Sequence, residues 1–177
     1  KVAARANAIK LGDPLDLETQ MGALISAQHL EKVLGYIEEA KQTSARLVCG
    51  GQRHTSVATK DGYFVEPTIF ADCTDDMVHV QEEIFGPVLV SMTFRTQTEA
   101  VALANNSRYG LSASVRSENI NRAMDVAPNV EAGVVWINTH NPFDAACGFG
   151  GVKESGFGRQ GGKEGCPLYT SYASHQP

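Results

Sequence analysis

The sequence contains no concentration of positive charge. Its 177 residues include 15 Lys and Arg against 20 Asp and Glu, which gives a net charge of −5. Because the basic residues are scattered, they form no footprint for nucleic acid or an anionic membrane, and we expect neither as a partner. The sequence also lacks an apolar run near the roughly 20 residues that span a bilayer, and residues 1–5 lack the apolar core of a signal peptide. We therefore expect a cytoplasmic protein, with an organelle matrix as the alternative.

The sequence also lacks clustered metal ligands and a dense set of cysteines. The five histidines form no H-x-x-x-H pattern and join no cysteine cluster, so we expect no metal site. The cysteines are too sparse for a disulfide framework, which predicts reduced thiols. No neighbouring base or helix start in the sequence favours a reactive thiolate at any of them, so we predict no catalytic cysteine in this chain. The four cysteines are Cys49, Cys73, Cys147 and Cys166.

No internal repeat, charge block or Pro/Ser-rich linker divides the chain, so we predict that residues 1–177 form one domain. The hydrophobic content of 42% and the charged content of 20% are ordinary for a soluble globular fold. Predicted strands alternate with predicted helices, which indicates βαβ units and an α/β fold around a parallel sheet. In such folds the functional residues lie on loops at the carboxyl ends of strands.

Capping residues predict where the helices begin and end. Ser26 precedes apolar residues at i, i+3, i+4 and i+7 spacing, which is typical of an amphipathic helix. Asp75 and Asp76 suit a helix start, and Thr96–Glu99 forms a capping box. Pro128 is predicted to stop the last helix, because proline disfavours helical geometry in the residue before it. The predicted helices span residues 27–43, 75–82, 100–105 and 119–127.

Short β-rich runs lie between these helices. Pro67 cannot donate to a strand ladder, so it is expected at a strand end or sheet edge. Residues 134–137 form a continuous apolar run, which predicts a strand buried on both faces. Residues 52–60 are predicted to form a polar surface loop. The predicted strands span residues 46–49, 63–70, 88–94, 111–115 and 134–137.

A pair of carboxylates, Glu82 and Glu83, stands directly before a turn fixed by Gly86 and Pro87. An ionised carboxylate can accept two hydrogen bonds from a ribose diol, and an aromatic face such as that of Phe85 can pack on a nicotinamide ring. From the Glu-Glu dipeptide alone, the more common outcome is a solvated pair next to a short helix, with Phe85 in the core.

The long loop after residues 134–137 is rich in aromatic residues and contains one acid. Phe143 and Phe149 suit an apolar pocket for a small substrate, and Asn138 closes the preceding strand. The alternative is that Asn138 only ends the strand and the phenylalanines belong to the core. His140 could touch a substrate, but a solvated loop histidine is the simpler interpretation.

Residues 156–161 satisfy the pattern G-x-G-x-x-G, but we reject a nucleotide-binding interpretation. That fingerprint needs a preceding strand, a following helix and a complete βαβ unit. Here it follows Lys153-Glu154-Ser155 and comes close to the end of the sequence.

Several motifs together resemble one enzyme family. Residues 81–88, Gln-Glu-Glu-Ile-Phe-Gly-Pro-Val, and residues 149–156, Phe-Gly-Gly-Val-Lys-Glu-Ser-Gly, are similar to the carboxy-terminal part of the catalytic domain of the aldehyde dehydrogenase superfamily. The similarity also includes Tyr109-Gly110-Leu111 and Trp136-Ile137-Asn138, and the ending at 158–165 resembles a divergent branch with two-module members. Two positions depart from the family pattern: Ala23, where proline is usual, and Gln160, where glutamate is common.

The resemblance implies an incomplete α/β catalytic domain of parallel-sheet αβα type. It implies that Glu83 and Phe85 contact the nicotinamide ribose and ring of NAD or NADP. It also implies that Asn138 helps to position the reacting groups, while Phe143 and Phe149 line the aldehyde tunnel. The implied partners are a small-molecule aldehyde, the rest of the parent enzyme, and further copies of it in a homo-oligomer.

In that family, the nucleophilic cysteine, the general-base glutamate and the dinucleotide-binding domain precede the part that this chain resembles. The resemblance therefore implies a fragment of an enzyme that oxidises an aldehyde to an acid through a cysteine thiohemiacetal and thioester, and the fragment is expected to be inactive alone. Two other interpretations stay open: a non-catalytic module of the same fold that binds a partner, and a simple α/β ligand-binding domain.

Overall fold

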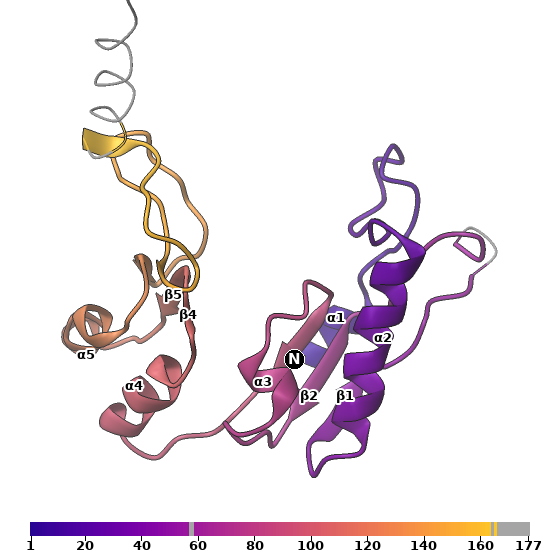
Figure 1. The fold of residues 1–177 in the computed structure, drawn as a ribbon, viewed down its shortest axis with the longest axis horizontal. Coiled ribbons are helices and arrows are strands. Elements are labelled where there is room, and N and C mark those ends of the chain that lie inside the picture. Colours follow the sequence, from indigo (N-terminus) through magenta and orange to yellow (C-terminus); the bar gives the residue numbers. More distant parts are fainter. Residues whose placement is uncertain (57–58, 164, 166–177) are drawn as a thin grey trace, which may run out of the picture. The chain divides into compact units, whose positions relative to one another are not determined.

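The structure is a computed structural model that describes residues 1–56, 59–163 and 165. Its internal contacts divide the chain into two compact units, Lys1–Thr93 and a second unit that begins at Phe94 (Figure 1). The sequence predicts no boundary at this point, because no change of composition marks it. Along the described chain, no helix is both long enough and apolar enough to cross a membrane.

The first unit contains a three-stranded sheet in the order β1-β2-β3. Strand β1 (Arg46–Cys49) pairs antiparallel with β2 (Thr68–Ala71), and β2 pairs parallel with β3 (Val88–Val90) in a register that places Thr68 opposite Val88. Pro67 directly precedes the central strand β2, where its missing N–H removes no bond from the ladder.

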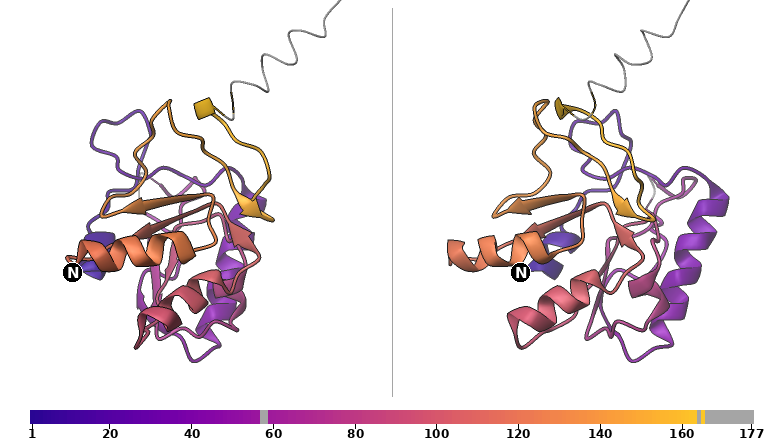
Figure 2. Two further views of the ribbon diagram at one scale, coloured as in Figure 1. Left: turned by 90° about the vertical axis from the view of Figure 1, so that its left-hand side faces the viewer. Right: turned by 60° about the vertical axis from the view of Figure 1, so that its left-hand side comes forward.

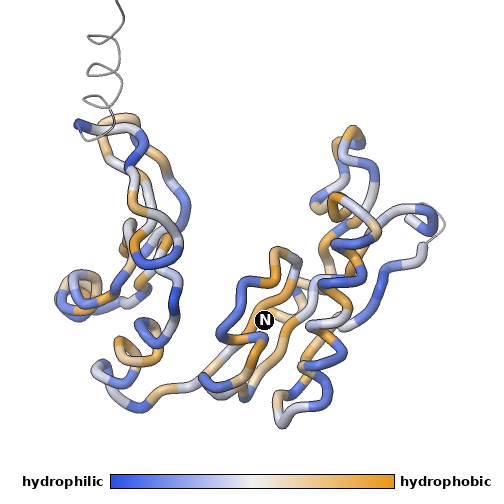
Figure 3. Tube along the Cα trace, in the orientation of Figure 1, coloured by the Kyte–Doolittle hydropathy of each residue, from blue (hydrophilic) through white to orange (hydrophobic). Residues whose placement is uncertain are grey.

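Three helices belong to the first unit: α1 (Val2–Asn7), α2 (Ala27–Lys41) and α3 (Val78–Gln81). Ser26 caps α2 as predicted, because its side chain accepts a hydrogen bond from the His29 amide at 3.1 Å. Figure 3 shows hydrophobic and hydrophilic positions interspersed along α2. Its buried face packs with Phe70 of β2 in one core cluster, and a fully buried aliphatic or aromatic side chain contributes about 1.5–3 kcal/mol. The buried residues of α2 are Leu30, Val33, Ile37 and Ala40.

The second unit is built around two short strand pairs. Strand β5 (Ser112–Val115) pairs parallel with β6 (Val134–Ile137), and β4 (Tyr109–Gly110) pairs antiparallel with β7 (Val152–Lys153). Figure 2 shows the chain leaving β6, forming a long loop and returning to β7. The helices of this unit are α4 (Gln97–Asn105), α5 (Ile120–Val126) and the 3₁₀ helix η1 (Ala127–Asn129).

Both parallel pairs enclose a helix, β2-α3-β3 in the first unit and β5-α5-β6 in the second. The predicted α/β class is therefore confirmed. The first sheet is mixed rather than purely parallel, because β1 joins β2 in the antiparallel direction.

Two helix starts differ from the sequence prediction. Helix α3 begins at Val78 instead of Asp75, because the Thr74 hydroxyl donates to the Asp76 carboxylate and closes a local turn there. That hydrogen bond is the main reason that the pKa of Asp76 is lowered. Helix α4 begins directly after Thr96, whose side chain accepts from the Glu99 amide at 3.1 Å.

The prediction that residues 134–137 are buried on both faces is wrong. Only Trp136 of β6 is buried, and the other three residues are half-buried, because in the described chain β6 pairs with β5 alone. The prediction that the last helix stops before Pro128 is confirmed for the α-helix, and a short 3₁₀ helix follows it. Helix α5 ends at Val126, and Pro128 then stands in the first turn of η1, where its missing N–H is not needed.

The polar loop predicted at residues 52–60 includes Thr59, which is buried.

Candidate functional site

The turn that carries Glu83 and Phe85 connects α3 to β3. Phe85 has a backbone φ of 57°, in the left-handed region. For a residue other than glycine this conformation is strained by about 1–3 kcal/mol and persists only where surrounding contacts enforce it. The side chain of Phe85 is 67% exposed, so burial of the ring does not enforce the conformation.

Helix α2 supplies the contacts that hold this turn. His29 Nε2 lies 2.7 Å from the carbonyl oxygen of Phe85, and the Tyr36 hydroxyl donates to Glu82 Oε2 at 2.5 Å. At the next residue, a Cβ added to Gly86 would lie 2.7 Å and 2.8 Å from the two γ-carbons of Val33. Glycine is therefore needed at residue 86 for the turn to approach the helix this closely.

The two neighbouring carboxylates differ in their surroundings. Glu82 is bonded to Tyr36, whereas no described residue donates a hydrogen bond to the carboxylate of Glu83, which is exposed. The acceptor capacity of Glu83 is therefore not used by any described residue. Phe85 borders an open hollow of about 500 Å³. The hollow is lined by Met21, Gly22, Ala23, Leu24, Val65, Phe85, Gly86 and Pro87.

Aromatic rings gather on the loop after β6 in the second unit. The rings of Phe143 and Phe149 meet edge to face with centroids 5.0 Å apart, and Trp136 meets Phe143 in the same way at 6.2 Å. His140 packs edge-on against Trp136 at 5.2 Å, and its Nδ1 lies 2.8 Å from Ser114 Oγ. Phe143 is 64% exposed, which is unusual for a core ring. The structure thus brings Phe143 and Phe149 together, and Trp136 and His140 join the same group of ring contacts.

Asn138 ends β6 with a φ of 57°. Its Oδ1 accepts a hydrogen bond from the Ser117 amide at 2.9 Å, and the residue is exposed. Asn138 thus ends the strand, as one of the two interpretations expects. Its side-chain amide nitrogen can still donate a hydrogen bond to another group. Asn138 also borders a shallow hollow of about 500 Å³ together with Arg116, Ser117 and Glu118.

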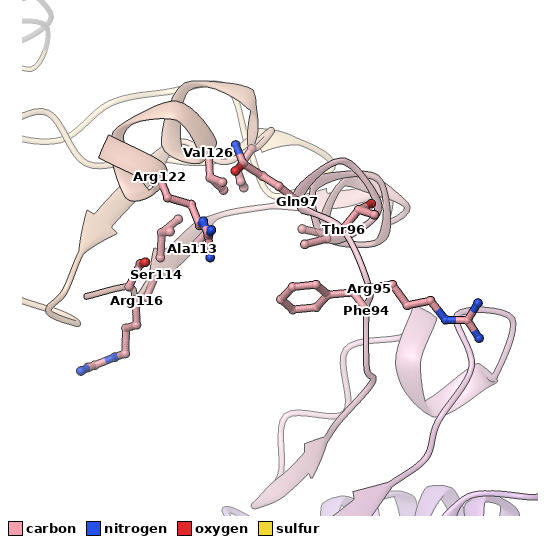
Figure 4. A pocket seen from close by; sticks show the side chains of 14 residues that line it. Phe94, Arg95, Thr96, Gln97, Ala113, Ser114, Arg116, Arg122 and Val126 are labelled. Carbon is pink, nitrogen blue, oxygen red and sulfur yellow. The ribbon is translucent and has the colours of Figure 1, made fainter. Parts of the chain in front are cut away.

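A further hollow of about 550 Å³ lies in the second unit among α4, β5 and α5 (Figure 4). Alanine and valine side chains form much of its lining, and Arg116 and Arg122 contribute guanidinium groups. Among the described residues that line it, none was predicted as a site residue. The sequence contains no local signal for this hollow, because alternating Ala and Val on a strand usually indicate core.

The glycine-rich segment at residues 156–161 folds back on the preceding chain, and Gly162, Lys163 and Gly165 directly after it are helical. Phe149 and Gln160 exchange two backbone hydrogen bonds of 2.7 Å, and Arg159 Nη1 donates to the Gly151 carbonyl at 2.8 Å. A Cβ on Gly150 would lie 2.1 Å from the carbonyl oxygen of Gly158, so the backbones are in direct contact. This geometry is that of a packing turn.

The thiols described by the structure offer no activated nucleophile. Cys73 Sγ lies 3.9 Å from His79 Nε2, a base that the sequence did not reveal, but both residues are buried. Burial raises the pKa of the Cys73 thiol and lowers the pKa of His79, so both groups are held neutral. Cys49 is buried, Cys147 is exposed on the aromatic loop, and Cys166 lies outside the described residues. The described residues contain no group of three His, Cys, Asp or Glu that could hold a metal ion.

Comparison with known proteins gives one consistent result. A sequence model described as the aldehyde dehydrogenase family matches residues 1–174. A betaine aldehyde dehydrogenase of Cereibacter sphaeroides is 47% identical over 174 residues, which cover 98% of this chain and 35% of the relative. The chain thus spans about a third of the length of the curated relatives it matches.

Solved structures give the same picture. A betaine aldehyde dehydrogenase from Staphylococcus aureus in complex with NAD⁺ superposes with a TM-score of 0.91 and 43% identity, over 95% of this chain and 33% of the other. An aldehyde dehydrogenase from Bacillus cereus superposes with a TM-score of 0.88 and 46% identity, again over 95% and 33%.

Proposed function

The chain belongs to the aldehyde dehydrogenase family, and on that premise we propose that it forms the carboxy-terminal part of the catalytic domain of an NAD(P)-dependent aldehyde dehydrogenase. The observation that carries the proposal is the difference between the two carboxylates: Glu82 is bonded to Tyr36, whereas Glu83 is exposed, has no hydrogen-bond donor among the described residues, and lies two positions before the exposed Phe85. A ribose diol and a flat ring are the chemical groups that such a pair can bind.

The described residues fit a nicotinamide nucleotide. Glu83 would accept hydrogen bonds from the ribose hydroxyls, and the face of Phe85 would restrict the position of the ring beside it. When bound, the nicotinamide supplies the hydride acceptor. NAD is supported by the NAD⁺ complex of the Staphylococcus aureus relative, and NADP stays an alternative. Residues 156–161 form a packing turn, so this glycine-rich segment is not proposed as a phosphate cradle.

On the substrate side we propose that Asn138, Phe143 and Phe149 line the aldehyde pocket. The relatives are named betaine aldehyde dehydrogenases, and betaine aldehyde carries a quaternary ammonium group. Aromatic faces bind such cations by cation–π attraction, and the rings of Trp136, Phe143 and Phe149 form a connected aromatic group. We therefore propose a preference for cationic aldehydes.

The test of this preference compares betaine aldehyde with 3,3-dimethylbutanal, its neutral counterpart of similar shape. Betaine aldehyde should have the higher kcat/KM. Equal kcat/KM values would contradict the cation preference.

The nucleophile, the general base and most cofactor contacts would come from other parts of the longer protein. A non-catalytic scaffold of the same fold is the alternative, and the full coding sequence separates the two. A cysteine in a Gly-Gln-Cys context a few tens of residues before Lys1 supports the enzyme, and its absence supports the scaffold. A homo-oligomer, a cytoplasmic location and the lack of nucleic-acid or membrane partners remain predictions for the intact protein.

The test of the proposed function is Glu83→Gln in the full-length protein. The substitution keeps the size of the side chain but removes charge-assisted acceptance, which is typically worth about 1.5–3 kcal/mol per bond. We expect a higher KM for NAD⁺ and slower hydride transfer, measured as NADH formation under single-turnover conditions. Glu82→Gln is the matched control, because glutamine can still accept from Tyr36. Unchanged cofactor affinity and turnover in Glu83→Gln would remove this assignment.

A further inference from the structure

We propose that one face of α2, formed by His29, Val33 and Tyr36, is a template that sets the backbone of the turn at residues 82–86, and that His29 is a positioning residue for cofactor binding. The proposal rests on the proposed function, in which Glu83 and Phe85 contact the nicotinamide nucleoside.

The three template residues stand at positions i, i+4 and i+7 of one helix, so they share a face. Each contacts a different residue of the turn: His29 bonds the carbonyl of Phe85, Val33 fills the space over Gly86, and Tyr36 bonds Glu82. Two side chains of the turn are left out of these contacts: the carboxylate of Glu83 and the ring of Phe85 are both exposed. The helix therefore contacts the turn at the Glu82 carboxylate, the Phe85 carbonyl and Gly86, and it leaves the proposed ligand-binding side chains free.

The hydrogen bond from His29 acts at the strained residue. A carbonyl oxygen can only accept, so His29 Nε2 carries the proton in this contact and donates it across 2.7 Å. Phe85 has its left-handed φ of 57° at the same place. An intact bond favours this conformation over the extended alternatives, and the direction of the Phe85 ring follows from the backbone.

Tyr36 performs a second task by selecting between two carboxylates. Glu82 and Glu83 are adjacent and chemically alike, and a mobile turn could present either one. The 2.5 Å bond from the Tyr36 hydroxyl holds Glu82 against the helix. The turn then offers a single carboxylate, that of Glu83, in a fixed direction.

The experiment compares His29→Ala with His29→Gln in the full-length protein, with Gln28→Ala as a matched control at a neighbouring exposed position of α2. Loss of one hydrogen bond of this kind should raise the KM for NAD⁺ about fivefold in His29→Ala. His29→Gln retains an N–H donor at similar reach and should restore most of the affinity. The melting temperature and the KM for aldehyde should stay close to those of Gln28→Ala.

A purely structural role would give a different pattern. Equal behaviour of His29→Ala and His29→Gln, or a lower melting temperature with an unchanged KM for NAD⁺, would overturn the positioning role. If His29→Ala does not fold, Tyr36→Phe carries the test: release of Glu82 should raise the KM for NAD⁺ about twofold to threefold without loss of stability. An unchanged KM for NAD⁺ in a folded Tyr36→Phe protein would then overturn the template.

Glu83→Gln in the same set separates this inference from the proposed function. An effect of Glu83→Gln on cofactor affinity without any effect of His29→Ala leaves the function standing and overturns the template. No effect of Glu83→Gln overturns the cofactor assignment itself, and the template inference with it.

Discussion

The turn that carries Glu83 and the loop that carries Phe143 are held by different kinds of contact. The turn is fixed by side chains of α2 that lie 46 and 56 positions earlier in the chain. Many contacts of the loop are local: Trp136 Nε1 donates to the Pro142 carbonyl six residues on, and Asp144 Oδ1 accepts from the Ala146 amide. A turn imposed from a distant helix keeps its shape when neighbouring residues change, whereas a locally folded loop changes shape with its own sequence. The first arrangement suits the proposed cofactor contact, and the second suits the proposed substrate pocket.

The largest expected effect is the absence of turnover by the 177-residue chain itself. The turn offers a carboxylate and the loop offers the exposed thiol of Cys147, but covalent catalysis needs an activated nucleophile with a base in reach. We expect no NADH formation with several aldehydes and only weak NAD⁺ binding, together with self-association in light scattering because apolar side chains such as Leu17 and Ile25 are exposed. Robust turnover that Cys147→Ala abolishes would make the loop, rather than the missing part, the source of the nucleophile.

The next largest effect tests whether the two units unfold separately. Phe70 is fully buried in the core behind α2, so Phe70→Ala should destabilise the first unit by about 3–5 kcal/mol. The only tryptophan, Trp136, lies in the second unit, so its fluorescence reports that unit while circular dichroism reports both. In urea unfolding, we expect Phe70→Ala to lower the midpoint of the circular dichroism transition and to leave the midpoint of the Trp136 fluorescence transition unchanged.

Phe157→Ala is the control for that comparison. Its ring is fully exposed, so its removal should change stability by less than about 0.5 kcal/mol. A joint shift of both signals in Phe70→Ala would show that the two units unfold as one.

A smaller effect should separate the loop from the turn in the full-length enzyme. Phe143→Ala and Phe149→Ala each remove one member of an edge-to-face pair worth about 0.5–1.5 kcal/mol, so kcat/KM ratios among aldehydes should change about twofold to tenfold. The KM for NAD⁺ should stay constant, in contrast to Glu83→Gln. A uniform loss of activity for all aldehydes with a lower melting temperature would show that both rings belong to the core.

The smallest expected effect concerns the pH dependence of stability in the first unit. Burial lowers the pKa of His79 below its ordinary 6.5, and the opposing attraction of the Glu39 carboxylate is the weaker influence. The unfolded chain therefore binds a proton first as the pH falls, so stability is full above pH 6.5 and decreases below it. The urea concentration at the unfolding midpoint should decrease as the pH is lowered from 7.5 to 5.5. His79→Leu should make this decrease with pH smaller.

His140→Asn is the control for His79, because His140 lies on the exposed loop of the second unit. It should retain the pH slope of the parent chain. An equal slope in His79→Leu would show that the buried imidazole does not govern acid sensitivity.

Local features of the fold were predictable, and tertiary contacts were not. Ser26 and the apolar spacing after it predict α2 to within a few residues, because a cap and a helical period are properties of neighbouring residues. The predicted start of α3 was wrong because the Thr74 hydroxyl bonds the Asp76 carboxylate, which is then not available to cap the helix. Capping preferences do not include such a contact. The prediction that residues 134–137 are buried on both faces was wrong, because an apolar run does not reveal how many strands pair with it.

The same division applies to the candidate site. Glu83, Phe85, Asn138, Phe143 and Phe149 were selected from motifs, and their assignment stays a prediction. The contacts that distinguish Glu82 from Glu83 could not be read from the sequence, because Tyr36 lies 46 residues away and carries no motif. The pairing of Cys73 with His79 was missed for a similar reason, since six residues of irregular chain give no period to follow.

The contact between Gly86 and Val33 has a consequence for how this site can evolve. Gly86 does not have a positive φ, so its backbone would tolerate a larger residue, and only the space filled by Val33 prevents one. The two positions are therefore coupled in size: alanine at 86 becomes acceptable only after position 33 has shrunk, as in Val33→Ala. Mutations would have to arrive in that order, and the free energies of the single and double changes would not add. Lineages that depart from glycine at this turn are expected to carry a smaller residue on the facing helix.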